Sequence, residues 1–250
     1  AFDVIGVAVQ SADLPREVPA ALLSTDPWEV VGRPCDVVVE LIGGTDPASA
    51  LIEAALARGC HVVTANKAVI ARDGERLREI ARSTGSELLF SASVGGALPA
   101  IELVRRLQGI QRIEGVLNGT CNFVIDRISS GQDLEAAIFE AQQAGYAEAD
   151  PSTDLSGSDA AHKISVLARE AFGVSPRPFQ FFGLTDAVEQ VAKAAACGKT
   201  LRLVASCYAT PDGCEARVET QQCPADSPLA QTEGVGNCVI VRTGSGEQIV

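Results

Sequence analysis

The sequence lacks the features that mark membrane and secreted proteins. It contains no uninterrupted apolar stretch long enough to cross a bilayer, and no charged segment followed by an apolar one opens it. Basic residues are also few, 20 against 32 acidic ones, and the net charge of −12 opposes non-specific binding to nucleic acid or anionic membranes. We therefore expect a cytoplasmic protein without nucleic-acid or membrane partners, whose anionic ligands are held by local cationic groups.

Aromatic residues and methionine are scarce as well. Aromatics make up 4% of the chain, and small aliphatic residues supply most of the apolar content. Such a core favours helices packed on a sheet over a β-sandwich. The 250 residues include no methionine, so we expect that residues are missing and that some spacings are short by a residue or more.

The cysteines do not follow a pattern that indicates a disulfide framework or a metal site. There are eight, without a C-x-x-C pair, and the chain has only two histidines. The nearest approach to a cluster is Cys207, Cys214 and Cys223. We expect small buried thiols in a reducing compartment instead of zinc ligands.

The first hundred residues alternate between apolar, β-branched runs and helical patterns. Strands are expected at 2–9, 35–42, 61–66 and 87–92, with helices at 46–58 and 74–84. Asp46 and Pro47 fit the N-cap and first turn of the earlier helix, and Gly59 fits its end. This order predicts an α/β fold with a doubly wound parallel (Rossmann-like) sheet, whose ligands bind at the carboxyl edge of the strands.

No G-x-G-x-x-G fingerprint accompanies this pattern. We interpret residues 1–100 as a dinucleotide-binding domain whose first strand and glycine-rich loop are missing. The alternative is a Rossmann-like domain that binds no nucleotide. Gln10 and Ser11 stand where an acidic residue would favour NAD, and Arg16 lies nearby, which favours NADP.

The pattern changes over residues 101–250. Helices are expected at 99–107, 133–144 and 159–172, and strands at 110–116, 200–205, 215–220 and 237–242. This predicts a second, α+β domain with a mixed sheet that binds the substrate. The apolar segments near 200–206 and 237–241 are candidates for the interface of a homodimer or higher homo-oligomer.

Residues 144–163 hold a dense group of ionisable side chains. They are Glu148, Asp150, Asp154, Asp159 and Lys163. Asp159 and Lys163 are four residues apart on an expected helix and so share a face. One interpretation is an exposed acidic loop with a surface ion pair. The other is a site for a zwitterionic small molecule, in which carboxylates bind an ammonium group and the lysine binds an oxygen atom.

Four segments resemble the homoserine dehydrogenase family in order and spacing. They are T-A-N-K-A (64–68), S-A-S-V-G-G-A-L-P (91–99), I-E-G-V-L-N-G-T-C-N-F (113–123) and A-G-Y-A-E-A-D-P-S-T-D-L-S-G-S-D-A-A-H-K (144–163). The resemblance covers almost the whole chain. It implies an NAD(P)-dependent enzyme of threonine and methionine biosynthesis that interconverts L-homoserine and L-aspartate 4-semialdehyde. It also implies that residues 101–250 serve catalysis and dimerisation.

The resemblance further implies roles for single residues. Lys163 corresponds to the catalytic lysine of the family, and Lys67 to the lysine near the nicotinamide. Glu148 corresponds to a residue that binds the substrate amino group, and Asp154 and Asp159 to carboxylates of the same pocket.

Other positions are expected to contact substrate, cofactor or a cation. Asn118, Gly119 and Thr120 follow an expected strand and would face the same cleft, although a simple turn also explains them. The resemblance implies contacts to NADP or NAD at Ile42, Gly43, Gly44 and Thr45. It also implies Na⁺, or another monovalent cation, on the carbonyls of Val94, Gly96 and Leu98. Ser91 or Phe90 stands where the family often has a glutamate at that cation site.

The chemistry leaves alternatives open. When a hydride leaves a primary alcohol, negative charge builds on its oxygen, and Lys163 could stabilise that charge as a cation or remove the proton as a base. A different dehydrogenase of this architecture, with Cys121 as a nucleophile, is the second hypothesis. A regulatory module that binds a nucleotide or an amino acid is the third.

Overall fold

The computed structural model describes residues 2–96 and 98–250. The chain divides into two compact units, Ala1–Ser93 and Val94–Val250. The pattern of the sequence predicts the boundary between residues 100 and 101. In the part of the chain that the structure describes, no helix is both long enough and apolar enough to span a membrane.

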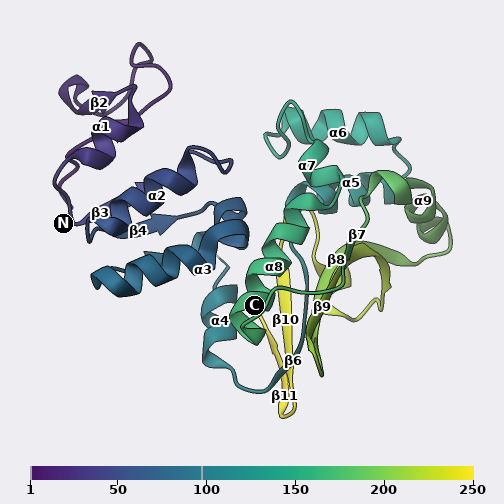
Figure 1. Ribbon diagram of the computed structural model, residues 1–250. Coiled ribbons are helices and arrows are strands. Elements are labelled where there is room, and N and C mark those ends of the chain that lie inside the picture. Colours follow the sequence, from purple (N-terminus) through teal and green to yellow (C-terminus); the bar gives the residue numbers. More distant parts are fainter. Residues whose placement is uncertain (1, 97) are drawn as a thin grey trace. The chain divides into compact units, whose positions relative to one another are not determined.

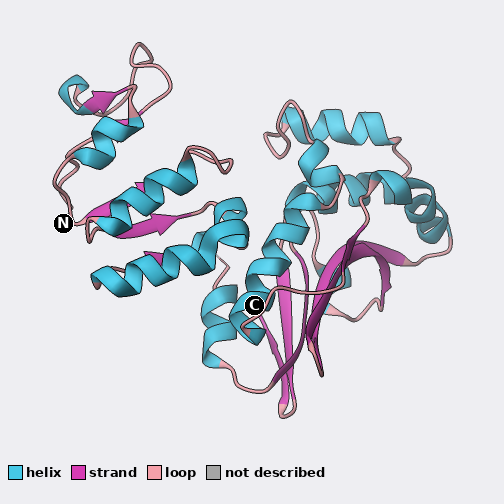
Figure 2. Ribbon diagram, viewed as in Figure 1, coloured by secondary structure: helices cyan, strands magenta, loops and turns pink. Residues whose placement is uncertain are grey.

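The first unit contains a parallel sheet of three strands in the order β3-β4-β5. The strands are β3 (Val37–Glu40), β4 (His61–Thr64) and β5 (Leu88–Leu89), and the helices between them are α2 (Ala48–Ala57) and α3 (Lys67–Thr84). The two helices pack on each other and against the strands (Figures 1 and 2). The expected strand–helix alternation of a Rossmann-like domain is confirmed.

The two faces of this sheet differ. Val38 pairs in register with Val62, which pairs with Leu88, and this face is covered. Val39 and Leu89 belong to the other face, and both side chains are exposed. Successive residues of a strand point to opposite faces. Glu40 and Thr64, which also pair in register, therefore lie on the covered face.

Two helix starts in this unit were predicted wrongly. The earlier helix has Pro47, not Asp46, at its N-cap, and the Asp46 carboxylate lies 3.5 Å from an Arg72 nitrogen instead of capping the helix. The later helix begins at Lys67 and not near residue 74. Its N-cap is Asn66, whose side chain accepts a hydrogen bond from Val69 N.

The predicted first strand was wrong in extent and in burial. Only β1 (Val7–Ala8) forms, and it pairs with β2 (Leu23–Ser24) in a separate two-stranded sheet. Phe2 is 93% exposed. An apolar run becomes a buried strand only when neighbouring layers cover it. A 3-10 turn (Ala20–Leu22) and α1 (Pro27–Gly32) complete this region, and another 3-10 turn (Ser91–Ser93) ends the unit.

The second unit is built on a six-stranded sheet in the order β11-β10-β6-β8-β9-β7. Its strands are β6 (Ile110–Val116), β7 (Phe179–Phe181), β8 (Thr200–Thr210), β9 (Gly213–Cys223), β10 (Cys238–Thr243) and β11 (Gly246–Ile249). Neighbouring strands are antiparallel, apart from the parallel pair β7 and β9. The predicted mixed sheet of an α+β domain is confirmed.

Seven helices of this unit are described in residues 98–250. They are α4 (Ala100–Arg106), α5 (Gly119–Ser129), α6 (Leu134–Gln143), α7 (Ser152–Leu155), α8 (Ser158–Phe172), α9 (Val188–Ala196) and α10 (Pro228–Gln231), with a 3-10 turn at Thr185–Ala187. Helix α8 packs on β8 and β9, and α10 contacts β8 (Figure 1). The three helices expected here are confirmed within two residues at each end.

The strands expected at an interface between subunits are interior strands of this sheet. Val204 on β8 and Val239 on β10 have no exposed surface, and Leu203 and Ile240 are almost completely buried. Their side chains form the core of one chain. These two segments therefore offer no free surface to a second copy.

Candidate active site

Lys163 lies on α8 in contact with two oxygen atoms. Its Nζ is 2.7 Å from an Asp159 carboxylate oxygen and donates a hydrogen bond of 2.7 Å to the carbonyl of Leu117. The Lys163 side chain is 16% exposed and that of Asp159 6%. The prediction that the two side chains share a helix face is confirmed. Their burial argues against the alternative of a surface ion pair.

Asn118 joins two carboxylates of the acidic segment. Its side-chain nitrogen donates to Asp154 at 2.7 Å and to Asp159 at 2.9 Å. Its side-chain oxygen accepts from Cys121 N at 2.7 Å and caps α5. One amide thus fixes two carboxylates and the start of a helix. We call Lys163, Asp159, Asp154, Asn118 and the Leu117 carbonyl the Lys163 cluster.

The residues after Asn118 hold neighbouring segments in place. A Cβ atom on Gly119 would lie 2.7 Å from the carbonyl oxygen of Val235, so packing alone requires glycine there. Thr120 Oγ1 donates to the carbonyl of Tyr146 at 2.6 Å and anchors the start of the acidic segment. The alternative that residues 118–120 form a simple turn is wrong, because they begin α5.

Helix α5 is also tied to a segment far along the chain. Asn122 Nδ2 donates to the carbonyls of Thr232 at 2.8 Å and of Gly234 at 3.0 Å. Gly234 N donates to an Asp126 carboxylate oxygen at 2.7 Å. The residues that lead into β10 therefore support the helix that carries Asn118.

The hydrogen bonds described for the remaining acidic residues of the segment go to groups outside the cluster. Glu148 and Asp150 are exposed. The backbone carbonyl of Glu148 accepts from Gln142 Nε2 at 3.1 Å, and one Asp150 carboxylate oxygen accepts from Ser152 N at 3.0 Å. The expected role of Glu148 as a substrate ligand stays a prediction.

Cys121 is buried beside the cluster. Its thiol donates to the carbonyl of Asp154 at 3.1 Å. Burial raises the pKa of the Cys121 thiol, and the charges of Asp154 and Asp159 raise it further. A nucleophilic cysteine needs a lowered pKa or an adjacent base. This environment therefore argues against the hypothesis that Cys121 attacks an aldehyde.

The cofactor-binding residues that we expect in the first unit lie at the carboxyl ends of β3 and β4. Gly43 and Gly44 both adopt left-handed backbone angles, with φ of 80° and 65°. A Cβ atom on either would meet no atom within 4 Å, so a ligand can approach this backbone closely. Lys67 is half-buried and opens α3, next to the carboxyl end of β4.

One acidic residue at this edge was not predicted from the sequence. Glu40 ends β3 and accepts hydrogen bonds from the backbone N–H groups of Ile42 at 2.8 Å and Gly43 at 3.3 Å. Its only signal in the sequence is a carboxylate that interrupts an apolar run just before two glycines. The Leu117 carbonyl was also missed, because a backbone acceptor leaves no mark in the sequence.

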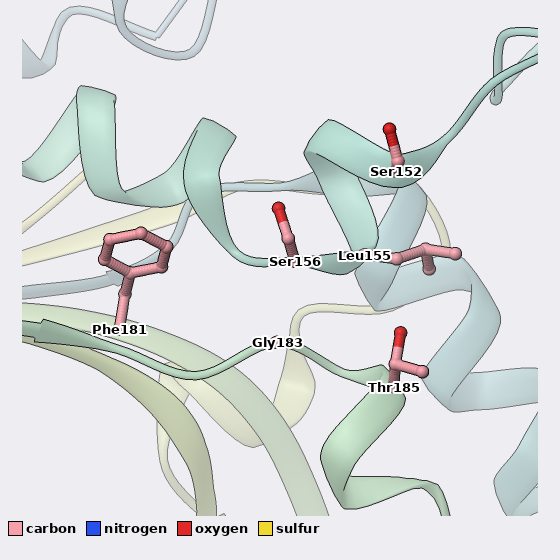
Figure 3. A pocket seen from close by; sticks show the side chains of 6 residues that line it. All are labelled: Ser152, Leu155, Ser156, Phe181, Gly183 and Thr185. Atoms are coloured by element: carbon pink, nitrogen blue, oxygen red, sulfur yellow. The ribbon is translucent and has the colours of Figure 1, made fainter.

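A pocket of about 440 Å³ lies beside α7, on the segment that also carries Asp154. Figure 3 shows the residues that line it, which come from α7 with its C-cap and from residues 181–185. They are Ser152, Leu155, Ser156, Phe181, Gly183 and Thr185. None of these six is charged. The pocket therefore offers a ligand hydroxyl groups and apolar surface, but these six residues provide no charged partner for an ammonium or carboxylate group.

Two family models match the chain. Residues 97–250 match the model described as homoserine dehydrogenase, and residues 1–91 match the model described as the NAD binding domain of homoserine dehydrogenase. The boundary between the matches lies close to the boundary between the two compact units.

Proteins with similar sequences belong to the same family as these two models. A homoserine dehydrogenase from Synechocystis sp. is 40% identical over 96% of this chain, and one from Pseudomonas aeruginosa is 36% identical over 96%. The chain spans 59% and 57% of the length of these two relatives.

Solved structures extend the comparison. A homoserine dehydrogenase from Thiobacillus denitrificans superposes with a TM-score of 0.90 at 34% identity, covering 98% of this chain and 59% of that one. A hyperthermophilic archaeal homoserine dehydrogenase in complex with NADPH gives a TM-score of 0.78 at 29% identity, over 90% of this chain and 67% of that one. The Lys163 cluster lies in the segment that matches the first model, and the Gly43–Gly44 loop lies in the segment that matches the second. The chain therefore belongs to the homoserine dehydrogenase family.

Proposed function

We propose that the protein is a homoserine dehydrogenase, which interconverts L-homoserine and L-aspartate 4-semialdehyde by hydride transfer with NADP or NAD. The observation that carries this proposal is the Lys163 cluster. In it the mostly buried Lys163 of α8 lies between the Asp159 carboxylate and the Leu117 carbonyl, which directly precedes the N-cap of α5. The family matches support it over both units. The reaction acts on a CH–OH group, and the nicotinamide supplies or accepts the hydride when it is bound.

Lys163 stabilises the reacting oxygen in this mechanism. A lysine ammonium group has three donors. One donates to Leu117 O and one faces Asp159, and we assign the third to the hydroxyl or carbonyl oxygen of the substrate. As the hydride leaves homoserine, negative charge grows on that oxygen beside a fixed cation. The anionic neighbour favours this electrostatic role over that of a free-base lysine.

The carboxylates position the other end of the substrate. Asn118 holds Asp154 and Asp159 at fixed orientations, which prepares them to bind an ammonium group without reorganisation. Glu148, from the exposed start of the segment, completes this set in our proposal. Gly119 and Thr120 shape the wall of the same pocket.

The first unit binds the cofactor in this proposal. The loop of Ile42, Gly43, Gly44 and Thr45 presents an open backbone at the carboxyl edge of a parallel sheet, where dinucleotides bind in this architecture. Lys67 adds a positive charge at the same edge. An archaeal family member of known structure is in complex with NADPH, which supports NADP as the preferred form.

A monovalent cation has weaker support. Of the three expected carbonyl ligands, that of Leu98 already accepts a hydrogen bond of 2.8 Å from Ala100 N. Ser91 supplies no carboxylate. These donors fit Na⁺ only in part, and no step of the mechanism depends on it. We further propose a cytoplasmic homo-oligomer whose partners are small molecules and not nucleic acid.

The direct test uses the full-length protein. NADPH and NADH oxidation would be followed by absorbance with L-aspartate 4-semialdehyde as substrate. We expect oxidation with NADPH faster than with NADH, and production of homoserine in equal amount. A protein that oxidises neither dinucleotide with this substrate contradicts the proposal. Reduction of NADP⁺ or NAD⁺ by the aldehyde, with formation of an acyl phosphate from inorganic phosphate or of a thioester from coenzyme A, would favour the second dehydrogenase class.

A further inference from the structure

Glu40 is a buried carboxylate that the proposed mechanism does not use. It is 4% exposed and lies on the covered face of the parallel sheet, in register with Thr64. The preceding residues on this face, Val38 and Val62, are apolar. Burial of a carboxylate is unfavourable unless hydrogen bonds replace its water. A carboxylate at this position therefore calls for a reason beyond packing.

Four neutral groups donate hydrogen bonds to this carboxylate. Oε1 accepts from Ile42 N at 2.8 Å, from Gly43 N at 3.3 Å and from Asn66 Nδ2 at 3.4 Å. Oε2 accepts from Thr64 Oγ1 at 2.5 Å. Bonds from backbone N–H groups to a carboxylate are charge-assisted and stronger than those between neutral groups. The carboxylate thus fixes the backbone just before the two left-handed glycines.

Asn66 extends the same network to α3. Its side-chain nitrogen also donates to the carbonyl of Gly44 at 2.7 Å, and its side-chain oxygen accepts from Val69 N. Its backbone N–H donates to Thr64 Oγ1 at 2.9 Å. One set of bonds therefore fixes both the Ile42–Gly44 loop and the first turn of α3, where Lys67 lies. We call Glu40, Thr64 and Asn66 the Glu40 network.

We propose that Glu40, through Thr64 and Asn66, is a positioning residue for the dinucleotide. It holds the Ile42–Gly44 backbone and the Lys67 end of α3 in one arrangement before the cofactor binds, which lowers the cost of ordering them on binding. This inference rests on the proposed function, because the loop must bind the dinucleotide for its position to matter. Glu40 faces the covered side of the sheet, and in this proposal it acts through the loop and not by contact with the cofactor.

The network requires a carboxylate and a hydroxyl, not merely polar groups of the same size. In Glu40→Gln an amide nitrogen would replace one acceptor. If that nitrogen faced Thr64, the threonine hydroxyl would receive bonds from both the new amide and Asn66 N, and its own proton would lose its acceptor. In Thr64→Val both Glu40 Oε2 and Asn66 N would lose their partner, whereas Thr64→Ser keeps the hydroxyl.

The test compares Glu40→Gln, Thr64→Val and Thr64→Ser with wild type in the full chain. The control is Ser49→Ala, which removes another buried hydroxyl of the same unit, bonded to Asp73 at 2.6 Å. The measurements are the Kd of NADPH by calorimetry, KM for both substrates, kcat and the thermal midpoint. We expect the Kd and KM of NADPH to rise about tenfold in Glu40→Gln and Thr64→Val, as loss of a charge-assisted bond allows. KM for aspartate semialdehyde should stay within about twofold, since the residues that bind it lie in the other unit.

The controls separate a positioning role from a purely structural one. Thr64→Ser should restore the Kd of NADPH to within about threefold of wild type, and Ser49→Ala should lower the thermal midpoint without changing that Kd. If Glu40→Gln and Thr64→Val lower the midpoint but keep the wild-type Kd, the positioning role is overturned and the proposed function stands. A wild-type protein that binds neither NADPH nor NADH overturns both.

Discussion

The two units each contain a buried carboxylate, but the two carboxylates have different partners. In the Lys163 cluster Asp159 lies against an ammonium group and an amide. In the Glu40 network the donors are two backbone N–H groups, a hydroxyl and an amide. A cation beside a carboxylate can stabilise charge that develops during a reaction. Neutral donors instead hold one backbone conformation. The comparison predicts that changes in the cluster alter turnover and that changes in the network alter cofactor affinity.

The largest expected effect is that of Lys163→Ala. Without the ammonium group beside the reacting oxygen, kcat should fall by about 10²–10⁴-fold, while the Kd of NADPH stays within about twofold. Steady-state kinetics and calorimetry measure the two quantities. Lys193→Ala, which removes the exposed partner of Glu189, is the matched control and should behave as wild type. A Lys163→Ala protein with normal turnover would rule out both the electrostatic and the base mechanism.

Removal of the anion should have the next largest effect. In Asp159→Asn the ammonium group of Lys163 keeps neutral acceptors, such as the Leu117 carbonyl, but loses its negatively charged partner, so the free energy of unfolding should fall by about 3 kcal/mol. The lysine also loses its fixed position, and kcat should fall by about 10²-fold. Urea unfolding and kinetics check both values. Glu189→Gln at the exposed pair should leave the urea midpoint unchanged, and an equal loss there would mean that burial is not the cause.

Asn118→Asp separates helix capping from the orientation of the carboxylates. Aspartate keeps the acceptor for Cys121 N, so α5 stays capped. It removes the donor to Asp154 and Asp159 and places a like charge beside them. We expect kcat/KM for the amino-acid substrate to fall about tenfold with little change in helix content by circular dichroism. An unchanged kcat/KM would show that Asn118 acts only as a cap.

The smallest effect is expected at Cys121. Because its pKa is raised by burial, the thiol stays protonated at neutral pH, and alkylation by iodoacetamide should be slow there and speed up only at strongly alkaline pH. The exposed Cys197 should react first. Cys121→Ala should retain activity within about threefold. Rapid alkylation of Cys121 with loss of activity, prevented by substrate, would favour a thioester mechanism.

Elements with a clear local pattern were predicted well from the sequence. The expected strand at 110–116 coincides with β6, and α8 begins within one residue of its prediction. Both follow from hydrophobic periodicity, which depends on neighbours a few residues apart. The pairing of Asp159 with Lys163 was predicted for the same reason, since a helix turn places residues i and i+4 together.

Features that depend on distant partners were not predicted. Nothing near Glu40 in the sequence indicates that Thr64 and Asn66 will surround it, because they arrive through strand pairing. The first strand and the cap at Asp46 show the same limit: β1 pairs with a strand that the sequence pattern did not indicate, and Asp46 lies near the distant Arg72 instead of capping α2. For Lys163 the resemblance supplied the role, and the structure adds the Leu117 carbonyl and Asn118 that hold it.

The hydrogen bonds between α5 and residues 232–234 affect the order in which the site forms during folding. Asn122 bonds to Thr232 across a sequence separation of 110 residues, and β6, which delivers Leu117 and Asn118, lies between β8 and β10. Contacts this distant in sequence form late in folding, because a long loop must close first. A ribosome-bound chain that ends before residue 232 would thus contain every side chain of the Lys163 cluster and still lack the support of α5. The geometry of the cluster therefore depends on residues that are synthesised well after Lys163.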